Sequence, residues 1–170
     1  NYKLNKAQQK KIVSSLNLNK LILKYPLLKS LCSNYKYDVT KNNLKKLKKY
    51  KSYNIIGMGG SILGAQAIYD FLNNKIKKKF TFYDNLQSNK NFSNNGKKLN
   101  IIISKSGNTL ETFANFNLIL SRQKRNDNLI ITENKISILN KLASKLKADV
   151  IEHKNYIGGR YSVLSEVGML

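Results

Sequence analysis

The stretch that decides the fold is residues 101–112, Ile101-Ile102-Ile103-Ser104-Lys105-Ser106-Gly107-Asn108-Thr109-Leu110-Glu111-Thr112. Three consecutive β-branched apolar residues end in a run of small hydroxylated residues, a lysine and a glycine, and an amphipathic pattern follows. This order predicts a buried strand, a tight polar loop and the start of a helix. Hydroxyl groups and free backbone N–H groups then meet at the positive end of a helix dipole, where anions bind. The stretch therefore predicts a phosphate receptor.

Strand patterns and helix patterns alternate along the chain from Tyr53 onwards. Strands alternating with helices at this spacing predict a parallel sheet of about five strands with helices on both faces, a three-layer α/β/α sandwich. Right-handed crossovers place every strand-to-helix loop on one edge, where open α/β sheets bind ligands. Strands are expected at 53–56, 80–83, 99–103, 129–132 and 149–151, helices at 62–72, 110–123 and 136–146, and an exposed polar loop at 89–98.

The expected domain organisation has two parts. Residues 1–50 are interpreted as a helical, accessory segment, and residues 51–170 as the ligand-binding domain. Helical patterns cover 5–18 and 38–49, and Pro26, the only proline, interrupts the apolar segment between them. No residue of the first part carries recognisable chemistry.

The net charge of +22 raises the question of nucleic-acid or anionic-membrane binding. Nearly all of this charge is lysine, and the only arginines are Arg122, Arg125 and Arg160. A base-reading surface would normally show arginines and stacking aromatic residues. The lysines fall in separate clusters on expected helix faces and loops. We therefore interpret the lysines as solvated surface residues rather than as a specific nucleic-acid-binding site.

Apolar runs and cysteine content indicate the cellular setting. The longest purely apolar runs are a few residues, far short of the roughly 20 that cross a bilayer, so no membrane association is expected. Cys32 is the only cysteine, which excludes an intrachain disulfide and makes a reducing cytoplasm the expected location.

The first glycine-rich loop, Gly57-Met58-Gly59-Gly60-Ser61, follows the strand expected at 53–56. Glycines at a strand-to-helix turn let an anion approach the backbone amides closely, although a tight turn alone also requires glycine. The dinucleotide fingerprint G-x-G-x-x-G fails here, because its third glycine position is occupied by Ile62. Asp84 does stand where a ribose-binding acid would be expected, which keeps a nucleotide alternative open. Ser61 could also serve only as a helix N-cap.

The second loop adds hydroxyl groups at the same predicted edge of the sheet. Ser104, Ser106 and Thr109 match the acceptor oxygens of a phosphate. Lys105 either supplies charge or points to solvent. Gly107 removes a side chain where the backbone must pass near the ligand. Two such loops on one edge can converge on a single anion.

A third feature is the pair of glycines that precedes an arginine in Gly158-Gly159-Arg160. Arg160 is one of three arginines in a lysine-dominated chain. Its guanidinium stays charged at any relevant pH and can stabilise a developing oxyanion.

Taken together, the three motifs resemble the glucose-6-phosphate isomerase family, within the wider sugar-isomerase (SIS) fold group. The matching segments are Gly57-Met58-Gly59-Gly60-Ser61-Ile62-Leu63-Gly64, Ser104-Lys105-Ser106-Gly107-Asn108-Thr109-Leu110-Glu111-Thr112 and Gly158-Gly159-Arg160-Tyr161-Ser162. The resemblance covers roughly residues 53–170. One departure is Gly107-Asn108, where many members carry a larger residue and threonine, so that one hydroxyl contact would be lost.

The resemblance implies interconversion of glucose 6-phosphate and fructose 6-phosphate through an enediol intermediate, without metal or organic cofactor, in an enzyme that is usually a homodimer. Arg160 would stabilise the enediolate, and Lys105 would lie beside the bound phosphate. The residues implied to bind substrate, chiefly its phosphate, are Gly60, Ser61, Ser104, Ser106, Thr109 and Gly159.

The family's catalytic glutamate, histidine and lysine follow the G-G-R-[FY]-S segment, and the chain continues only to Leu170. His153 precedes the motif and is interpreted as an ordinary loop residue, and Glu166 as part of a helix surface. We therefore expect a fragment that does not isomerise sugar phosphates alone. The alternatives are a non-catalytic sugar-phosphate-binding SIS domain and, more weakly, a nucleotide-binding α/β domain.

Overall fold

The structure is a computed structural model that describes residues 5–15, 17–86, 96–122 and 126–169. Most of the loop predicted at 89–98 lies outside these residues. The chain forms two compact units, 1–35 and 36–170. The first unit contains the helices α1 (Lys6–Ser15) and α2 (Leu18–Lys24) and the 3-10 helix η1 (Pro26–Leu31).

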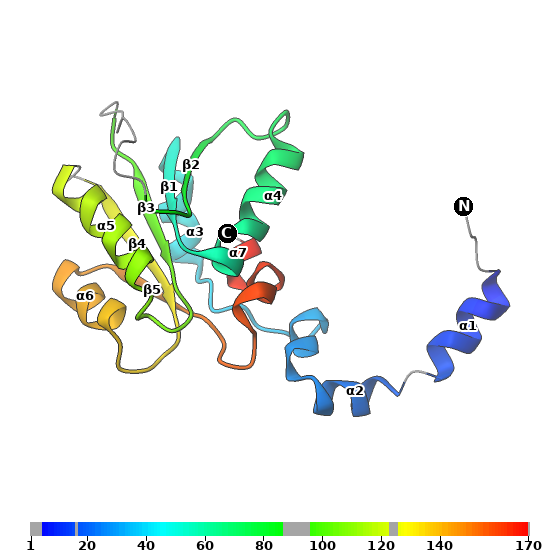
Figure 1. Cartoon of the computed structure of the whole chain (residues 1–170). Coiled ribbons are helices and arrows are strands. Elements are labelled where there is room, and N and C mark those ends of the chain that lie inside the picture. The colour runs from blue at the N-terminus through cyan, green and yellow to red at the C-terminus, as the bar shows by residue number, and fades with distance from the viewer. Residues whose placement is uncertain (1–4, 16, 87–95, 123–125, 170) are drawn as a thin grey trace. The chain divides into compact units, whose positions relative to one another are not determined.

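The second unit is built on a five-stranded sheet with the order β2-β1-β3-β4-β5. All neighbouring strands run parallel. Each of the five strands predicted from the sequence is present, and Figure 1 shows them twisting through the middle of the unit. The strands are β1 (Ser52–Ile56), β2 (Lys79–Tyr83), β3 (Leu99–Ile103), β4 (Asp127–Thr132) and β5 (Asp149–Glu152).

Helices cover both faces of the sheet, which confirms the predicted three-layer α/β/α sandwich (Figure 1). Phe116 and Leu139 belong to the core between the sheet and the helices α5 and α6. Leu47 and Val167 belong to the core on the opposite face of the sheet. The helices of this unit are α3 (Lys41–Lys48), α4 (Leu63–Leu72), α5 (Leu110–Arg122), α6 (Ile138–Leu146) and α7 (Glu166–Met169), and the 3-10 helices are η2 (Gly59–Ser61) and η3 (Gly159–Leu164).

Helix α3 shows why the unit that holds the sheet begins at Lys36, ahead of the predicted boundary between residues 50 and 51. Thr40 caps the helix, since its hydroxyl accepts a hydrogen bond from the backbone N–H of Asn43 (3.1 Å). Leu47 then enters the core beneath the sheet. Because α3 buries its apolar side against the strands, it belongs to the sheet unit.

A row of asparagine side chains crosses three strands at one register position. Asn54 in β1, Asn100 in β3 and Asn128 in β4 are paired in the sheet. Asn54 Nδ2 donates to Asn100 Oδ1 (2.8 Å), and Asn100 Nδ2 donates to Asn128 Oδ1 (2.9 Å). Asn54 and Asn100 are fully buried. The row satisfies both polar groups of the buried Asn100 side chain, which would otherwise destabilise the interior.

Replacement of the central asparagine tests this row. We expect Asn100→Ala to lower the free energy of unfolding by about 2 kcal/mol, because Asn54 loses its buried acceptor and Asn128 its donor. Urea unfolding measures the change. Asn128→Ala is the matched control, and since Asn128 is only half-buried, water can replace part of what is lost and the effect is expected to be smaller. Equal losses in the two variants would contradict the central role of Asn100.

Candidate phosphate-binding site

The first two predicted loops lie side by side because they follow neighbouring strands. Strand β1 pairs with β3 in parallel, so both strands end at the same edge of the sheet. A Cβ atom added to Gly57 would lie 3.1 Å from the carbonyl oxygen of Ile103, the residue before Ser104. The glycine-rich loop and the hydroxyl-rich loop are therefore adjacent.

The third motif is brought to the first by close backbone packing of η2 against η3. A Cβ atom added to Gly60 would lie 2.4 Å from Cα of Arg160, so only glycine permits this approach. Ser162 holds the contact, because its hydroxyl donates to the carbonyl oxygen of Gly60 (2.9 Å) and also to that of Gly159. Arg160 is thereby carried to the edge of the sheet that holds the two loops.

Three hydroxyl groups gather in the loop that follows β3. Ser104 Oγ lies 2.9 Å from Thr109 Oγ1, and Ser106 Oγ lies 3.4 Å from the same atom. Ser104 is buried, and its hydroxyl also accepts from the backbone N–H of Gly107 (3.2 Å). Ser106 is exposed. The cluster has a buried base and a solvent-facing side, as a site for a polar ligand requires.

The backbone N–H groups that open α5 lie directly after this cluster. The N–H groups of residues 110–112 make no hydrogen bond within the described part of the chain. The first turn of a helix leaves such donors free, and the helix dipole favours an anion beside them. Hydroxyls and N–H groups together can surround a phosphate.

The ammonium group of Lys105 is turned toward neighbouring protein groups. Lys105 Nζ donates to the carbonyl oxygen of Asn155 (2.7 Å) and lies 3.5 Å from a carboxylate oxygen of Glu133. Burial alone would raise the pKa of Glu133, but the hydrogen bond and charge of Lys135, together with the charge of Lys105, hold that pKa below its ordinary value. Lys105 therefore sits in an ion-pair network at the side of the loop.

The other predicted site residues differ in how accessible they are to a ligand. Arg160 is exposed, and its side chain makes no hydrogen bond or ion pair with any described residue. A Cβ atom added to Gly159 would meet nothing within 4 Å, so space is open beside it. Ser61 is buried at the end of η2. The guanidinium of Arg160 is thus accessible to a ligand, whereas Ser61 is packed into the protein.

Two residues interpreted as peripheral from the sequence are buried in the structure. Glu166 is fully buried, so its assignment to a helix surface is wrong. Its carboxylate accepts from the backbone N–H of Asp38 (3.2 Å), a contact between segments far apart in the sequence. His153 lies in a loop as expected but is also fully buried. Its Nδ1 lies 3.1 Å from the carbonyl oxygen of Lys154, and its buried Nε2 has no hydrogen-bond partner among the described residues.

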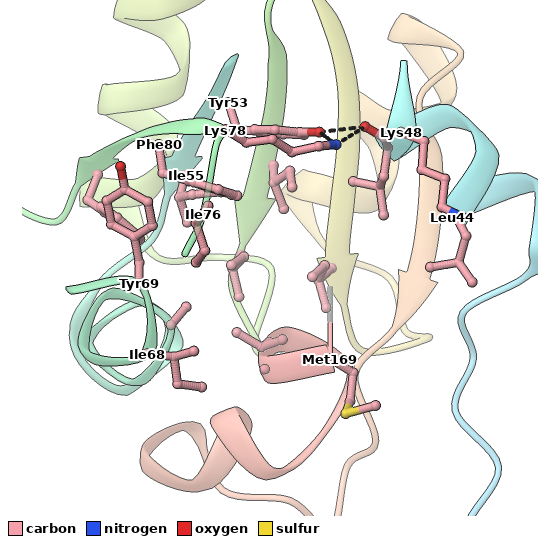
Figure 2. Close-up of a pocket in the computed structure, with 18 residues that line it drawn as sticks. Leu44, Lys48, Tyr53, Ile55, Ile68, Tyr69, Ile76, Lys78, Phe80 and Met169 are labelled. Carbon is pink, nitrogen blue, oxygen red and sulfur yellow. Dashed lines mark hydrogen bonds between the residues drawn. The ribbon is translucent and has the colours of Figure 1, made fainter. Parts of the chain in front are cut away.

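An apolar cavity of about 520 Å³ is separate from the polar loops and lies between the sheet and the helices α3, α4 and α7 (Figure 2). Figure 2 shows Ile68 and Met169 at separate places in the lower part of the view, with Lys78 above them beside Tyr53. Lys78 Nζ donates to the hydroxyl of Tyr53 (2.5 Å) and to the carbonyl oxygen of Leu47 (3.1 Å). No predicted site residue lines this cavity.

Metal sites require clustered ligating side chains, and membrane spans require long apolar helices. Among the described residues, no group of three or more histidine, cysteine, aspartate or glutamate residues is arranged to hold a metal ion. None of the helices described has both the length and the apolar character needed to span a bilayer.

Sequence comparison relates the chain to sugar-phosphate isomerases. The sequence profile described as phosphoglucose isomerase matches residues 28–170. Glucose-6-phosphate isomerase from Methanocaldococcus jannaschii is 35% identical over 144 residues, covering 78% of this chain and 35% of that protein. The enzyme of the same name from Borrelia garinii subsp. bavariensis is 34% identical over 157 residues, covering 80% of this chain and 29% of that protein. The chain thus spans about a third of the length of the curated relatives it matches.

Structural comparison supports the fold independently. A hypothetical protein from Thermus thermophilus superimposes with a TM-score of 0.67 at 20% identity, covering 95% of this chain and 41% of that one. Tagatose-6-phosphate ketose/aldose isomerase from Escherichia coli superimposes with a TM-score of 0.59 at 18% identity, covering 86% of this chain and 40% of that one. At such identities the similarity establishes the α/β/α architecture.

The backbone of Gly107 provides a stability test of the loop. Gly107 has φ +69°, and an added Cβ atom would lie 2.3 Å from Ser137 Oγ. We expect Gly107→Ala to lower the free energy of unfolding by about 1–3 kcal/mol, because both the backbone angle and the contact become strained. Chemical denaturation measures the loss. Gly159→Ala, with open space and no positive φ, is the matched control and should change little. A loss in Gly107→Ala as small as the one expected for Gly159→Ala would show that the loop tolerates a side chain.

His153 makes stability depend on pH. Burial lowers the pKa of His153 below its ordinary 6.5, with the charge of Lys105 acting in the same direction, although the Lys154 carbonyl and the Glu166 and Glu133 carboxylates oppose the shift. The unfolded chain then binds a proton at a higher pH than the folded chain. The free energy of unfolding should therefore fall as the pH drops below about 6.5.

Urea unfolding at pH 7.5 and pH 5.5 measures this dependence, with His153→Gln as the variant that cannot titrate. The loss of stability between these values should be smaller in His153→Gln than in the wild type. Identical pH dependence in the two proteins would mean that His153 is not the titrating group.

Proposed function

Because the chain belongs to the phosphoglucose isomerase family, we propose that its polar loops bind the phosphate group of a sugar phosphate. The observation that carries the proposal is the position of the hydroxyl cluster of Ser104, Ser106 and Thr109 against the free N–H groups that open α5. Both kinds of donor serve an anion. In the proposed site the phosphate lies between them.

The remaining predicted residues extend the site from the phosphate toward the sugar. Arg160 is the proposed stabiliser of the enediolate, because its guanidinium is exposed and free of partners among the described residues. Lys105 belongs to the loop of residues 104–109, called the phosphate loop below. Its ammonium group is proposed to add positive charge beside the phosphate while it remains paired with Glu133. The backbone segments proposed to pass closest to the substrate are those of Gly60, Ser61 and Gly159.

In a protein of the length of its relatives, we propose that this unit takes part in interconverting glucose 6-phosphate and fructose 6-phosphate, and that such a protein is a homodimer. That reaction moves a proton between the two carbons nearest the carbonyl, which requires a positioned base. The 170 residues are proposed to bind the sugar phosphate without isomerising it. In support, His153 and Glu166 are fully buried, and Glu166 is engaged by Asp38.

A non-catalytic sugar-phosphate-binding domain is the second candidate, since phosphate loops alone serve binding. The free guanidinium of Arg160 favours the enzyme, because a domain that only binds has no enediolate to stabilise. A nucleotide-binding domain is disfavoured, since Ile62 at the third glycine position is fully buried and packs in the core.

Titration calorimetry with 6-phosphogluconate tests the proposed site. We expect the chain to bind this sugar phosphate and not NAD, and Ser106→Ala to weaken binding by about tenfold, because a hydrogen bond to a charged group is lost. Ser121→Ala is the matched control, an exposed serine late in α5 whose hydroxyl donates to the carbonyl oxygen of Leu118.

A coupled assay with fructose 6-phosphate completes the test, and no turnover is expected from the purified chain. Binding of NAD without sugar-phosphate binding would overturn the proposed function. Measurable isomerisation would overturn only the proposal that these residues do not turn over substrate.

A further inference from the structure

One polar side chain of the phosphate loop is directed away from the hydroxyl cluster and toward another helix. Asn108 Oδ1 accepts a hydrogen bond from the backbone N–H of Ile138 (3.0 Å), the first residue of α6. The neighbouring carbonyl oxygen of Gly107 accepts from the N–H of Leu139 (3.0 Å). Two consecutive residues of the loop are therefore bound to two consecutive residues of a helix about 30 residues further along the chain.

These bonds use backbone N–H donors at the start of α6. Ser137 is the N-cap of this helix, and its hydroxyl accepts from the N–H of Asn140 (3.2 Å). The N–H groups of Ile138 and Leu139 are taken by the loop. The first turn of α6 thus has no donor left for an anion, in contrast to the first turn of α5.

The back of the loop is held by the same region of the chain. The carbonyl oxygen of Lys105 accepts from the N–H of Glu133 (3.1 Å) and from the hydroxyl of Thr132 (3.4 Å). With the bonds of Gly107 and Asn108, residues 132–139 fix one side of the loop. The hydroxyls of Ser104, Ser106 and Thr109 bond among themselves on the other side.

We propose that Asn108 is a positioning residue for the phosphate site, an inference that rests on the proposed function. In this proposal the Asn108 side chain acts through its bond to α6. Thr109 follows Asn108 directly and is bonded to Ser104 and Ser106. Holding Asn108 against Ile138 therefore fixes the peptide that places the Thr109 hydroxyl and the first N–H groups of α5 around the anion.

Asn108→Ala removes the side-chain acceptor of this link. We expect the affinity for 6-phosphogluconate to fall about three- to tenfold, because the loop must be ordered when the ligand binds. The amide proton of Ile138 should also exchange faster with solvent. In the wild type, bound 6-phosphogluconate should slow exchange at Ile138 and Leu139, although neither amide touches the ligand; Asn108→Ala should lose this protection at Ile138.

Thr40→Ala is the matched control, because it also removes a side-chain acceptor at the start of a helix. The Thr40 hydroxyl accepts from the N–H of Asn43 (3.1 Å) in α3, outside the phosphate loop. This variant should lower the urea midpoint to a similar degree as Asn108→Ala. It should leave the affinity for 6-phosphogluconate and the exchange of Ile138 unchanged, which separates positioning from general stability.

The outcomes distinguish this inference from the proposed function. If the wild type binds 6-phosphogluconate and Asn108→Ala binds it equally tightly, Asn108 does not position the site and the inference is wrong. Equal weakening by Thr40→Ala would also overturn it, since the effect would then follow stability alone. If the wild type binds no sugar phosphate, the proposed function is wrong and the positioning role falls with it.

Discussion

The pairing of β3 with β1 on one side and with β4 on the other is the constraint on which the site depends. All five side chains of β3 are buried, because helices cover both faces of the sheet. Both pairings are parallel, so the loops after β1, β3 and β4 leave the same edge. Without this arrangement, the hydroxyl cluster and the glycine-rich loop, against which the segment of Arg160 packs, would belong to unrelated parts of the surface.

The architecture could be predicted from the sequence wherever local pattern and burial agree. Leu99–Ile103 is apolar except for Asn100 and is bounded by polar residues, and it forms β3 at the predicted residues. Helix α6 begins two residues later than expected, because Ser137 caps it and adopts an extended backbone. The burial of Glu166 could not be predicted in this way, since it depends on Asp38, 128 residues earlier in the chain.

In the candidate site, too, local residue types could be interpreted from the sequence, whereas contacts with distant residues could not. Residue types alone led to the prediction of the hydroxyls and the arginine as site residues, because a phosphate and an oxyanion require donors and positive charge. The directions of Lys105 and Asn108 depend on Asn155 and Ile138, which are 50 and 30 residues away in the sequence. A short motif contains no information about such partners, so the interpretation of Asn108 as a lost hydroxyl contact missed its bond to α6.

The bonds between the phosphate loop and residues 132–139 also bear on the order in which the protein folds. The loop takes its shape from contacts made across about 30 residues, and contacts of that range form late because a long loop must first be closed. During synthesis, a nascent chain in which α6 has not yet been made carries the loop sequence without its shape. The proposed anion site is therefore complete only once β4 and α6 have docked, so that site assembly is coupled to folding.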